Sequence, residues 1–300
     1  MIENININVK ADPSNIKQQF TSINLKIHCC RYWKLGDWEL NNLSFPFWRL
    51  YYNILPGAKI IFNQKEYLLH EKSVLLIPPS TSFSTKLKNS NTEKLSGSRI
   101  VNNEEVQQLF NQEMVDHLFI HFNLGFQYDR VEPGIYEMDV DENLKSLLDE
   151  IRFSTIENNS YFGFRQTMQL QQLILQTVNR IPSEKWNNRK IDFRMMKVID
   201  HIDHNLSQKL SNENLAQVAM MATNSLLRLF KLSTGVTLQQ FLQLKRVEKA
   251  IILMHNQHSS IEQIAENCGF SDRHHFSKVF KRTTGNSPAV YRSLHTAEIG

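Results

Sequence analysis

Hydrogen-bonding and basic side chains recur at helical spacing in two stretches of the last third of the chain. At 100° per residue, the polar positions of the second stretch lie on the helix side opposite Phe276, Val279 and Phe280. Amide, imidazole, hydroxyl and cationic groups are those that hydrogen-bond base edges and contact phosphates. Any solvated helix has a charged outer face, but the same face occurring twice favours contact with a DNA major groove. The candidates are Asn224, Leu227, Arg228 and Lys231 in the first stretch, and Arg273, His274, Ser277, Lys278 and Lys281 in the second.

These two faces belong to an internal repeat. Each copy has an apolar-Ala pair, then a Phe-Lys pair, then a Thr-Gly pair, and the copies are offset by about 50 residues. Such a unit predicts a short helix, a tight turn and a second amphipathic helix, which is a helix-turn-helix. The pairs are Leu215-Ala216, Phe230-Lys231 and Thr234-Gly235, and then Ile264-Ala265, Phe280-Lys281 and Thr284-Gly285.

The turn chemistry is clearest in the second copy. Ser259 with Glu262 predicts a capping box at the start of a helix Ile261–Asn267. Gly269 can take a positive φ in the turn without steric cost, and Ser271 is placed to cap the next helix.

A long helix is predicted over residues 238–254, between the two copies, and it carries Arg246. Roughly 15 residues of helix span about 22 Å, so this helix can hold two reading heads apart. Successive major grooves on one face of DNA are about 34 Å apart.

The charge is unevenly divided along the chain. Residues 185–300 carry 16 Lys and Arg against 9 Asp and Glu, a balance of +7, whereas residues 1–184 carry 18 against 21, a balance of −3. A basic module joined to a mildly acidic one predicts a part that binds a polyanion and a part with another task. Residues 182–188 are predicted to link the two.

Residues 1–140 predict short strands separated by turns, typical of a barrel or sandwich. The polar stretch 86–116 is predicted to be disordered or a lid, with one amphipathic helix over 104–110. Leucine-rich stripes at helical spacing follow within residues 141–184, and they suit either a domain core or the seam of a dimer. The fold class is therefore α+β, with an all-α domain over 185–300.

The repeat resembles the AraC/XylS family of transcription regulators over about residues 191–294. The matching positions are Leu226, Arg228, Phe230-Lys231, Gly235, Arg246, Ala250, Ile261, Ile264-Ala265, Gly269-Phe270-Ser271, Phe276, Phe280-Lys281, Gly285, Pro288 and Tyr291-Arg292. A less specific likeness to that family's cupin-type barrel lies in Phe47-Trp48-Arg49-Leu50-Tyr51-Tyr52, Pro56-Gly57, Leu76-Ile77-Pro78-Pro79, His117 and His121-Phe122.

The resemblance implies a sensory barrel, a helical dimerisation segment and two helix-turn-helix units on double-stranded DNA. It implies a small-molecule effector such as a carbohydrate, RNA polymerase as a further partner, and a homodimer that activates or represses transcription. By position, it assigns base reading to Asn224, Leu227 and Arg228, and then to Arg273, His274, Ser277 and Lys278. Arg246 joins the DNA-binding residues.

The first copy departs from the family pattern. Met220 stands where glycine is usual, and Ala222 stands where a capping serine is usual, with Thr223 as the alternative cap. Leu227 is apolar where a polar reader is common, so it either touches a thymine methyl group or reads little sequence.

The barrel region offers candidates for ligand binding but little sign of catalysis. Trp33, Trp48, Tyr51 and His121 could line an effector site, although aromatic residues in a barrel are more often core. His117 and His121 would share one face of a strand and could hold a metal ion, but ordinary packing is the favoured interpretation. Because nucleophile, phosphate-loop and paired-carboxylate motifs are not found, we expect no enzyme activity and no cofactor. We expect no metal ion either, because the barrel region has no His-x-His pair and Phe83 stands where a cupin has its later histidine. The alternative is a cupin-type metalloenzyme fused to a DNA-binding module.

Three cysteines without a pairing pattern, no secretion signal and no long apolar run predict a cytoplasmic protein without a membrane partner.

Overall fold

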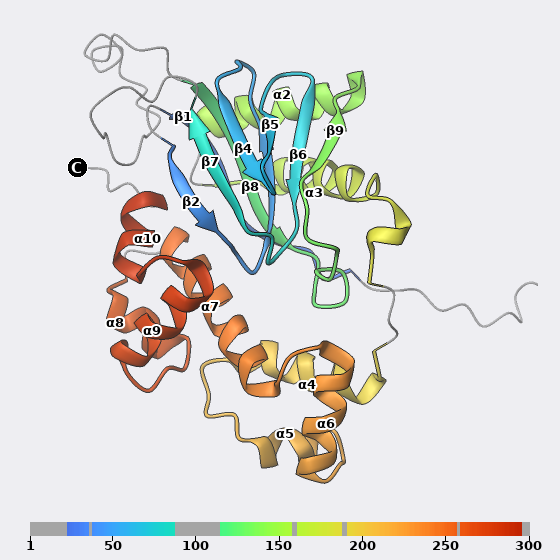
Figure 1. Ribbon diagram of the computed structural model, residues 1–300, viewed down its shortest axis with the longest axis vertical. Helices are drawn as coiled ribbons and strands as arrows, with labels where there is room; N and C mark the ends of the chain where they lie inside the picture. The colour runs from blue at the N-terminus through green and yellow to red at the C-terminus, as the bar shows by residue number, and fades with distance from the viewer. Residues whose placement is uncertain are drawn as a thin grey trace, which may run out of the picture.

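The structure is a computed structural model that describes residues 23–35, 38–87, 115–157, 161–187, 191–256 and 259–295. A β-sandwich flanked by two helices forms the N-terminal part, and seven helices form the C-terminal part below it (Figure 1). The helix predicted over 104–110 lies outside the described residues. Within the described ranges, no helix combines the length and the apolar character needed to cross a membrane.

The N-terminal part contains two antiparallel sheets that face each other. The first has the order β1 (Lys26–Leu35), β8 (Val115–Asn123), β3 (Trp48–Tyr52), β6 (Ser73–Ile77) and β9 (Tyr136–Asp139). The second has the order β2 (Leu40–Leu43), β7 (Phe83–Leu87), β4 (Ala58–Phe62) and β5 (Lys65–Leu68). All residues of β3 and β6 are buried, because one face of the first sheet packs on the second sheet and the other face packs on helices. We refer to the two sheets together as the barrel and to the space between them as the barrel interior.

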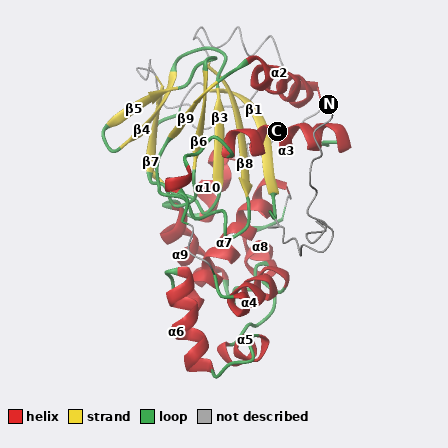
Figure 2. Ribbon diagram, turned by 90° about the vertical axis from the view of Figure 1, so that its right-hand side faces the viewer, coloured by secondary structure: helices red, strands yellow, loops and turns green. Residues whose placement is uncertain are grey.

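Helices α2 (Glu142–Glu157) and α3 (Phe164–Val178) cover the outer face of the first sheet (Figure 2). Their leucine-rich stripes, including Leu144, Leu148 and Leu173, are buried against that sheet. These stripes could have formed either a domain core or the seam of a dimer, and the structure shows that they form the core.

The segment predicted as a linker packs on the barrel. It contains a single 3-10 turn, η2 (Ser183–Lys185), and Trp186 pairs with Val131 in an isolated β-bridge. The polar composition of this segment suggested a free linker. The segment is held on the barrel instead because the Trp186 side chain packs against the hydrophobic core.

The C-terminal helices are α4 (Phe193–His204), α5 (Asn212–Val218), α6 (Thr223–Thr234), α7 (Leu238–Asn256), α8 (Ile261–Asn267), α9 (Arg273–Thr284) and α10 (Pro288–His295). The first unit, α5 and α6, shares a core with α4 and the start of α7. The second unit, α8 and α9, packs with the end of α7 and with α10.

The hydrophobic core of the second unit continues into the barrel. Phe45 of the barrel lies 5.9 Å from Tyr291 of α10 between ring centroids. Arg31 of β1 donates a hydrogen bond of 3.0 Å to the carbonyl oxygen of His255 in α7. These contacts connect the barrel directly to α7, the helix that joins the two units.

Candidate nucleic-acid interface

The two helix-turn-helix units share the same turn. The amide of Met221 donates to the carbonyl of Ala216 at 3.0 Å, and the amide of Phe270 donates to the carbonyl of Ala265 at 3.0 Å. Met220, like Gly269, takes a left-handed conformation, so the methionine does not disturb the geometry of the first turn.

The helix caps of the second unit lie one residue later than predicted. Ser260, not Ser259, caps α8, and it forms the capping box with Gln263, not Glu262. The cap of α9 is Asp272, which accepts from the amide of His275 at 2.7 Å, and not Ser271. The cap is the residue directly before the first helical residue. Because α8 begins at Ile261 and α9 begins at Arg273, the caps are Ser260 and Asp272.

In the first unit, Ala222 precedes α6 and provides no side-chain cap, and Thr223 is the first residue of the helix. Both α6 and α9 end at a glycine, Gly235 and Gly285, with φ of 82°. The hydroxyls of Thr234 and Thr284 donate back to the carbonyls of the preceding turn, at 2.7 and 2.9 Å.

The predicted DNA-contacting side chains lie on the outward faces of α6 and α9. The inward faces are buried through Leu226 and Phe230 in α6, and through Phe276 and Phe280 in α9. Leu227 is half-buried and packs against the core of the first unit, and Ser277 is half-buried. The exposed members are Asn224, Arg228, Lys231, Arg273, His274, Lys278 and Lys281.

Arg246 has a structural role that the sequence analysis did not assign to it. Its Nε donates to the carbonyl of Leu206 at 3.2 Å, and its Nη2 donates to the carbonyl of Gln208 at 3.0 Å. A Cβ atom at Gly269 would lie 2.4 Å from the Leu206 carbonyl oxygen and 2.9 Å from Nη2 of Arg246. Arg246 and Gly269 thus form a tight joint between the two units, and DNA contact by Arg246 stays a prediction.

Helix α7 joins the two units. Its 19 residues span about 28 Å. This length is of the order of the 34 Å or so between successive major grooves.

The candidate effector residues divide between two faces of the first sheet. Trp33, Tyr51 and His121 pack with the barrel interior. Trp48 lies on the opposite face, fully buried between the sheet and the helices, and its Nε1 donates to Asp129 at 2.9 Å. Because the side chains of a strand alternate in direction, Trp48 points away from the barrel interior, whereas Arg49 and Tyr51 point into it.

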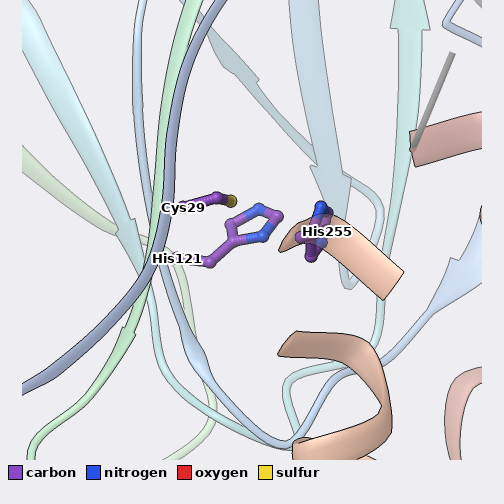
Figure 3. A group of neighbouring side chains, drawn as sticks. All are labelled: Cys29, His121 and His255. Carbon is purple, nitrogen blue, oxygen red and sulfur yellow. The ribbon is translucent and has the colours of Figure 1, made fainter. Parts of the chain in front are cut away.

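His117 and His121, both on β8, contact different groups. Nδ1 of His117 lies 2.8 Å from Oδ1 of Asn53, and burial lowers the pKa of His117 to about 3. His121 instead meets Cys29 from β1 and His255 from α7 (Figure 3). The sequence analysis missed this group, because no local spacing relates a residue of α7 to the barrel strands.

A helix-turn-helix domain family matches residues 215–293 of the chain. The probable transcriptional regulator LumQ of Photobacterium leiognathi is 33% identical over 108 residues, which are 36% of this chain and 44% of that protein. The HTH-type transcriptional activator RhaR of Mannheimia succiniciproducens is 28% identical over 151 residues, 50% of this chain and 54% of that protein. The chain thus spans about half the length of these two curated relatives.

The crystal structure of ToxT from Vibrio cholerae O395 resembles this chain over most of its length. It has a TM-score of 0.56 and 16% sequence identity, and the match covers 91% of this chain and 99% of ToxT. At that identity the likeness concerns the fold, which joins a β-sheet domain to a helical domain in both proteins. Residues 215–293 of this chain thus match a helix-turn-helix domain family, and the chain has a ToxT-like fold.

Proposed function

We propose that the protein is a sequence-specific DNA-binding transcription regulator. The observation that carries this proposal is the pair of matching outward faces on α6 and α9. They are presented by the same turn, bear hydrogen-bonding and basic side chains, and belong to residues 185–300, whose charge balance is +7. The basic side chains supply contacts with phosphates, and the exposed polar groups supply contacts with base edges.

We further propose that a small molecule bound by the barrel controls the DNA-binding domain. One hydrophobic cluster runs from the barrel interior into the second unit, so a ligand that repacks the barrel can shift α7. ToxT of Vibrio cholerae has been crystallised with an unsaturated fatty acid and with (E)-4-(8-methylnaphthalen-1-yl)but-3-enoic acid, both of which are carboxylic acids. In this chain the buried Arg49 lies among the rings of Phe45, Phe47 and Tyr51, a setting that suits an effector with an anionic and an apolar part. RNA polymerase is a further proposed partner.

A homodimer is also proposed, through the surfaces of α2 and α3 that the core leaves exposed. With the leucine-rich stripes buried, several large apolar residues still face outward on these helices. Their exposed fractions are 62% for Phe153, 85% for Phe164, 50% for Met168 and 40% for Leu175. A second copy placed on this surface would bury them.

The test is a selection of random genomic duplex fragments by the full-length protein at physiological salt, followed by sequencing. Enrichment of a site with two blocks about one helical turn apart would support reading by both units. A single enriched block would assign sequence reading to one unit, and α6 and α9 variants would show which. If no fragment is enriched, either alone or with carboxylic acids and sugars added, the proposal is wrong.

A further inference from the structure

Three potential metal-binding side chains meet where the barrel touches the DNA-binding domain. Cys29 and His121 are directly paired across the β1–β8 ladder, and both side chains point into the barrel interior. His255 enters from α7 on the opposite side (Figure 3). One sulfur or nitrogen atom from each of the three lies within 4.8 Å of the others.

The three side chains are shielded from solvent. Their exposed fractions are 7% for Cys29, 2% for His121 and 6% for His255. In a tetrahedral zinc site, Zn–S and Zn–N bonds of about 2.3 and 2.0 Å place the ligand atoms about 3.3 to 3.6 Å apart. The observed atoms therefore need to approach one another by little more than an ångström, which changes of side-chain torsion can supply.

We propose that Cys29, His121 and His255 form a binding site for a thiophilic metal ion, zinc or monovalent copper. A thiolate with two imidazoles is a ligand set that both ions accept. On binding, the Cys29 thiol loses its proton to solvent and its sulfur forms the bond to the metal, with no change of oxidation state.

The surroundings distinguish the two ions. Among the described residues, Arg31 and Arg49 lie near this site, and both act electrostatically on Cys29 and His255. A monovalent ion with one thiolate is neutral, whereas a divalent ion with one thiolate leaves an additional positive charge beside two arginines. Like charges repel strongly in a buried site, so the electrostatics favour copper over zinc.

The position of His255 is fixed by groups outside the ligand set. Arg31 binds its backbone carbonyl, and the hydroxyl of Tyr291 lies 3.3 Å from its Nε2. Contacts of this kind orient the imidazole of a metal ligand. Arg31 belongs to the barrel and Tyr291 to α10, so both parts of the protein hold the ring in place.

The site has a consequence for regulation, and this part of the inference rests on the proposed function. Two ligands lie on barrel strands and the third on the helix that joins the two helix-turn-helix units. A bound ion would therefore tie α7 to the barrel and limit the positions that α6 and α9 can take on DNA.

The experiment uses reduced, full-length protein and measures metal binding without DNA, so it remains decisive if the proposed function is wrong. Zinc, cobalt as its spectroscopic substitute, and monovalent copper under anaerobic conditions are each added, and metal per chain is measured after gel filtration. We expect one copper ion per chain and weaker binding of the divalent ions, with bound cobalt showing an absorption band from thiolate-to-cobalt charge transfer. Tighter binding of copper than of zinc would confirm the charge argument, and tighter binding of zinc would confirm the site but overturn that argument.

Matched variants locate the site. Cys29→Ser and His255→Gln should each weaken binding at least about tenfold and, for Cys29→Ser, abolish the charge-transfer band. Cys30→Ser is the control, because Cys30 is the next residue, is equally buried and faces Thr155 of α2 on the other side of the sheet. Circular dichroism of each metal-free variant checks its folding, and His255→Gln keeps the test open should Cys29→Ser not fold. Absence of stoichiometric metal with all three ions, or unchanged binding in folded Cys29→Ser or His255→Gln, would overturn the proposal.

Discussion

Met220 and Gly269 occupy equivalent positions in the two turns, with φ of 52° and 80°. The left-handed region costs an L-residue about 1–2 kcal/mol relative to glycine, because Cβ approaches the following carbonyl oxygen. Met220 is 90% exposed, so no packing compensates for that cost. In the second unit, Gly269 takes the same left-handed conformation without this cost, because glycine has no Cβ atom.

Met220→Gly should therefore stabilise the protein. We expect a gain of about 0.5–1 kcal/mol in the free energy of unfolding, since the relief of strain exceeds the added entropy of the unfolded glycine. Chemical denaturation of the full-length chain measures it. Gly269→Ala is the counterpart and should destabilise, because its Cβ would collide with the Leu206 carbonyl. A loss of stability in Met220→Gly would show that the side chain contributes more than its exposure indicates.

Capping provides a second prediction. Asp272→Ala should cost about 1 kcal/mol of stability, because the carboxylate accepts from the first free amides of α9. Ser271→Ala should cost less, since Ser271 only donates to the Asp272 carboxylate, at 3.0 Å. Thermal unfolding of the two variants compares them, and a larger effect at Ser271 would return the cap to that residue.

The sequence predicted the repeated units, and the structure confirms them, because apolar periodicity and the Thr-Gly ends are local signals. The sequence could not determine which residue caps α8, since Ser259 and Ser260 are adjacent and Glu262 and Gln263 both suit a capping box. The role of Arg246 and the meeting of His255 with Cys29 depend on contacts between segments distant in the chain. The spacing of neighbouring residues in the sequence does not predict such contacts.

The outward faces of α6 and α9 lead to a prediction on DNA binding. Arg228→Ala or Lys278→Ala, at equivalent positions, should weaken binding to the selected site by about 1–3 kcal/mol if the side chain reads a base. If it contacts phosphate, all sequences should weaken equally and the salt dependence should fall by about one unit. Fluorescence anisotropy at several salt concentrations separates the two cases. Lys65→Ala on the barrel is the control, and binding unchanged in both α6 and α9 variants would remove these residues from the interface.

The exposed surface of α3 makes the dimer testable. Phe164→Asp together with Met168→Glu should shift the protein from dimer to monomer, because charged groups would replace apolar contacts at the proposed interface. Sedimentation velocity measures the mass directly. Phe193→Asp, at an exposed phenylalanine of α4, is the matched control. A dimer that persists in the double variant would place the interface elsewhere.

His117 provides a prediction on pH dependence. Burial, with the nearby charge of Arg49 as a smaller cause, lowers the pKa of His117 from 6.5 to about 3. The unfolded chain then binds a proton that the folded chain does not, so this contribution to stability is complete above pH 6.5 and is lost as the pH falls toward 3. Between pH 6 and pH 5, the wild-type protein should lose about 1 kcal/mol more than His117→Gln, whose amide can still bond Asn53. Denaturation curves at both pH values measure this difference, with the exposed His274→Gln as the control expected to match wild type. Equal losses in wild type and His117→Gln would mean that His117 is protonated in the folded state.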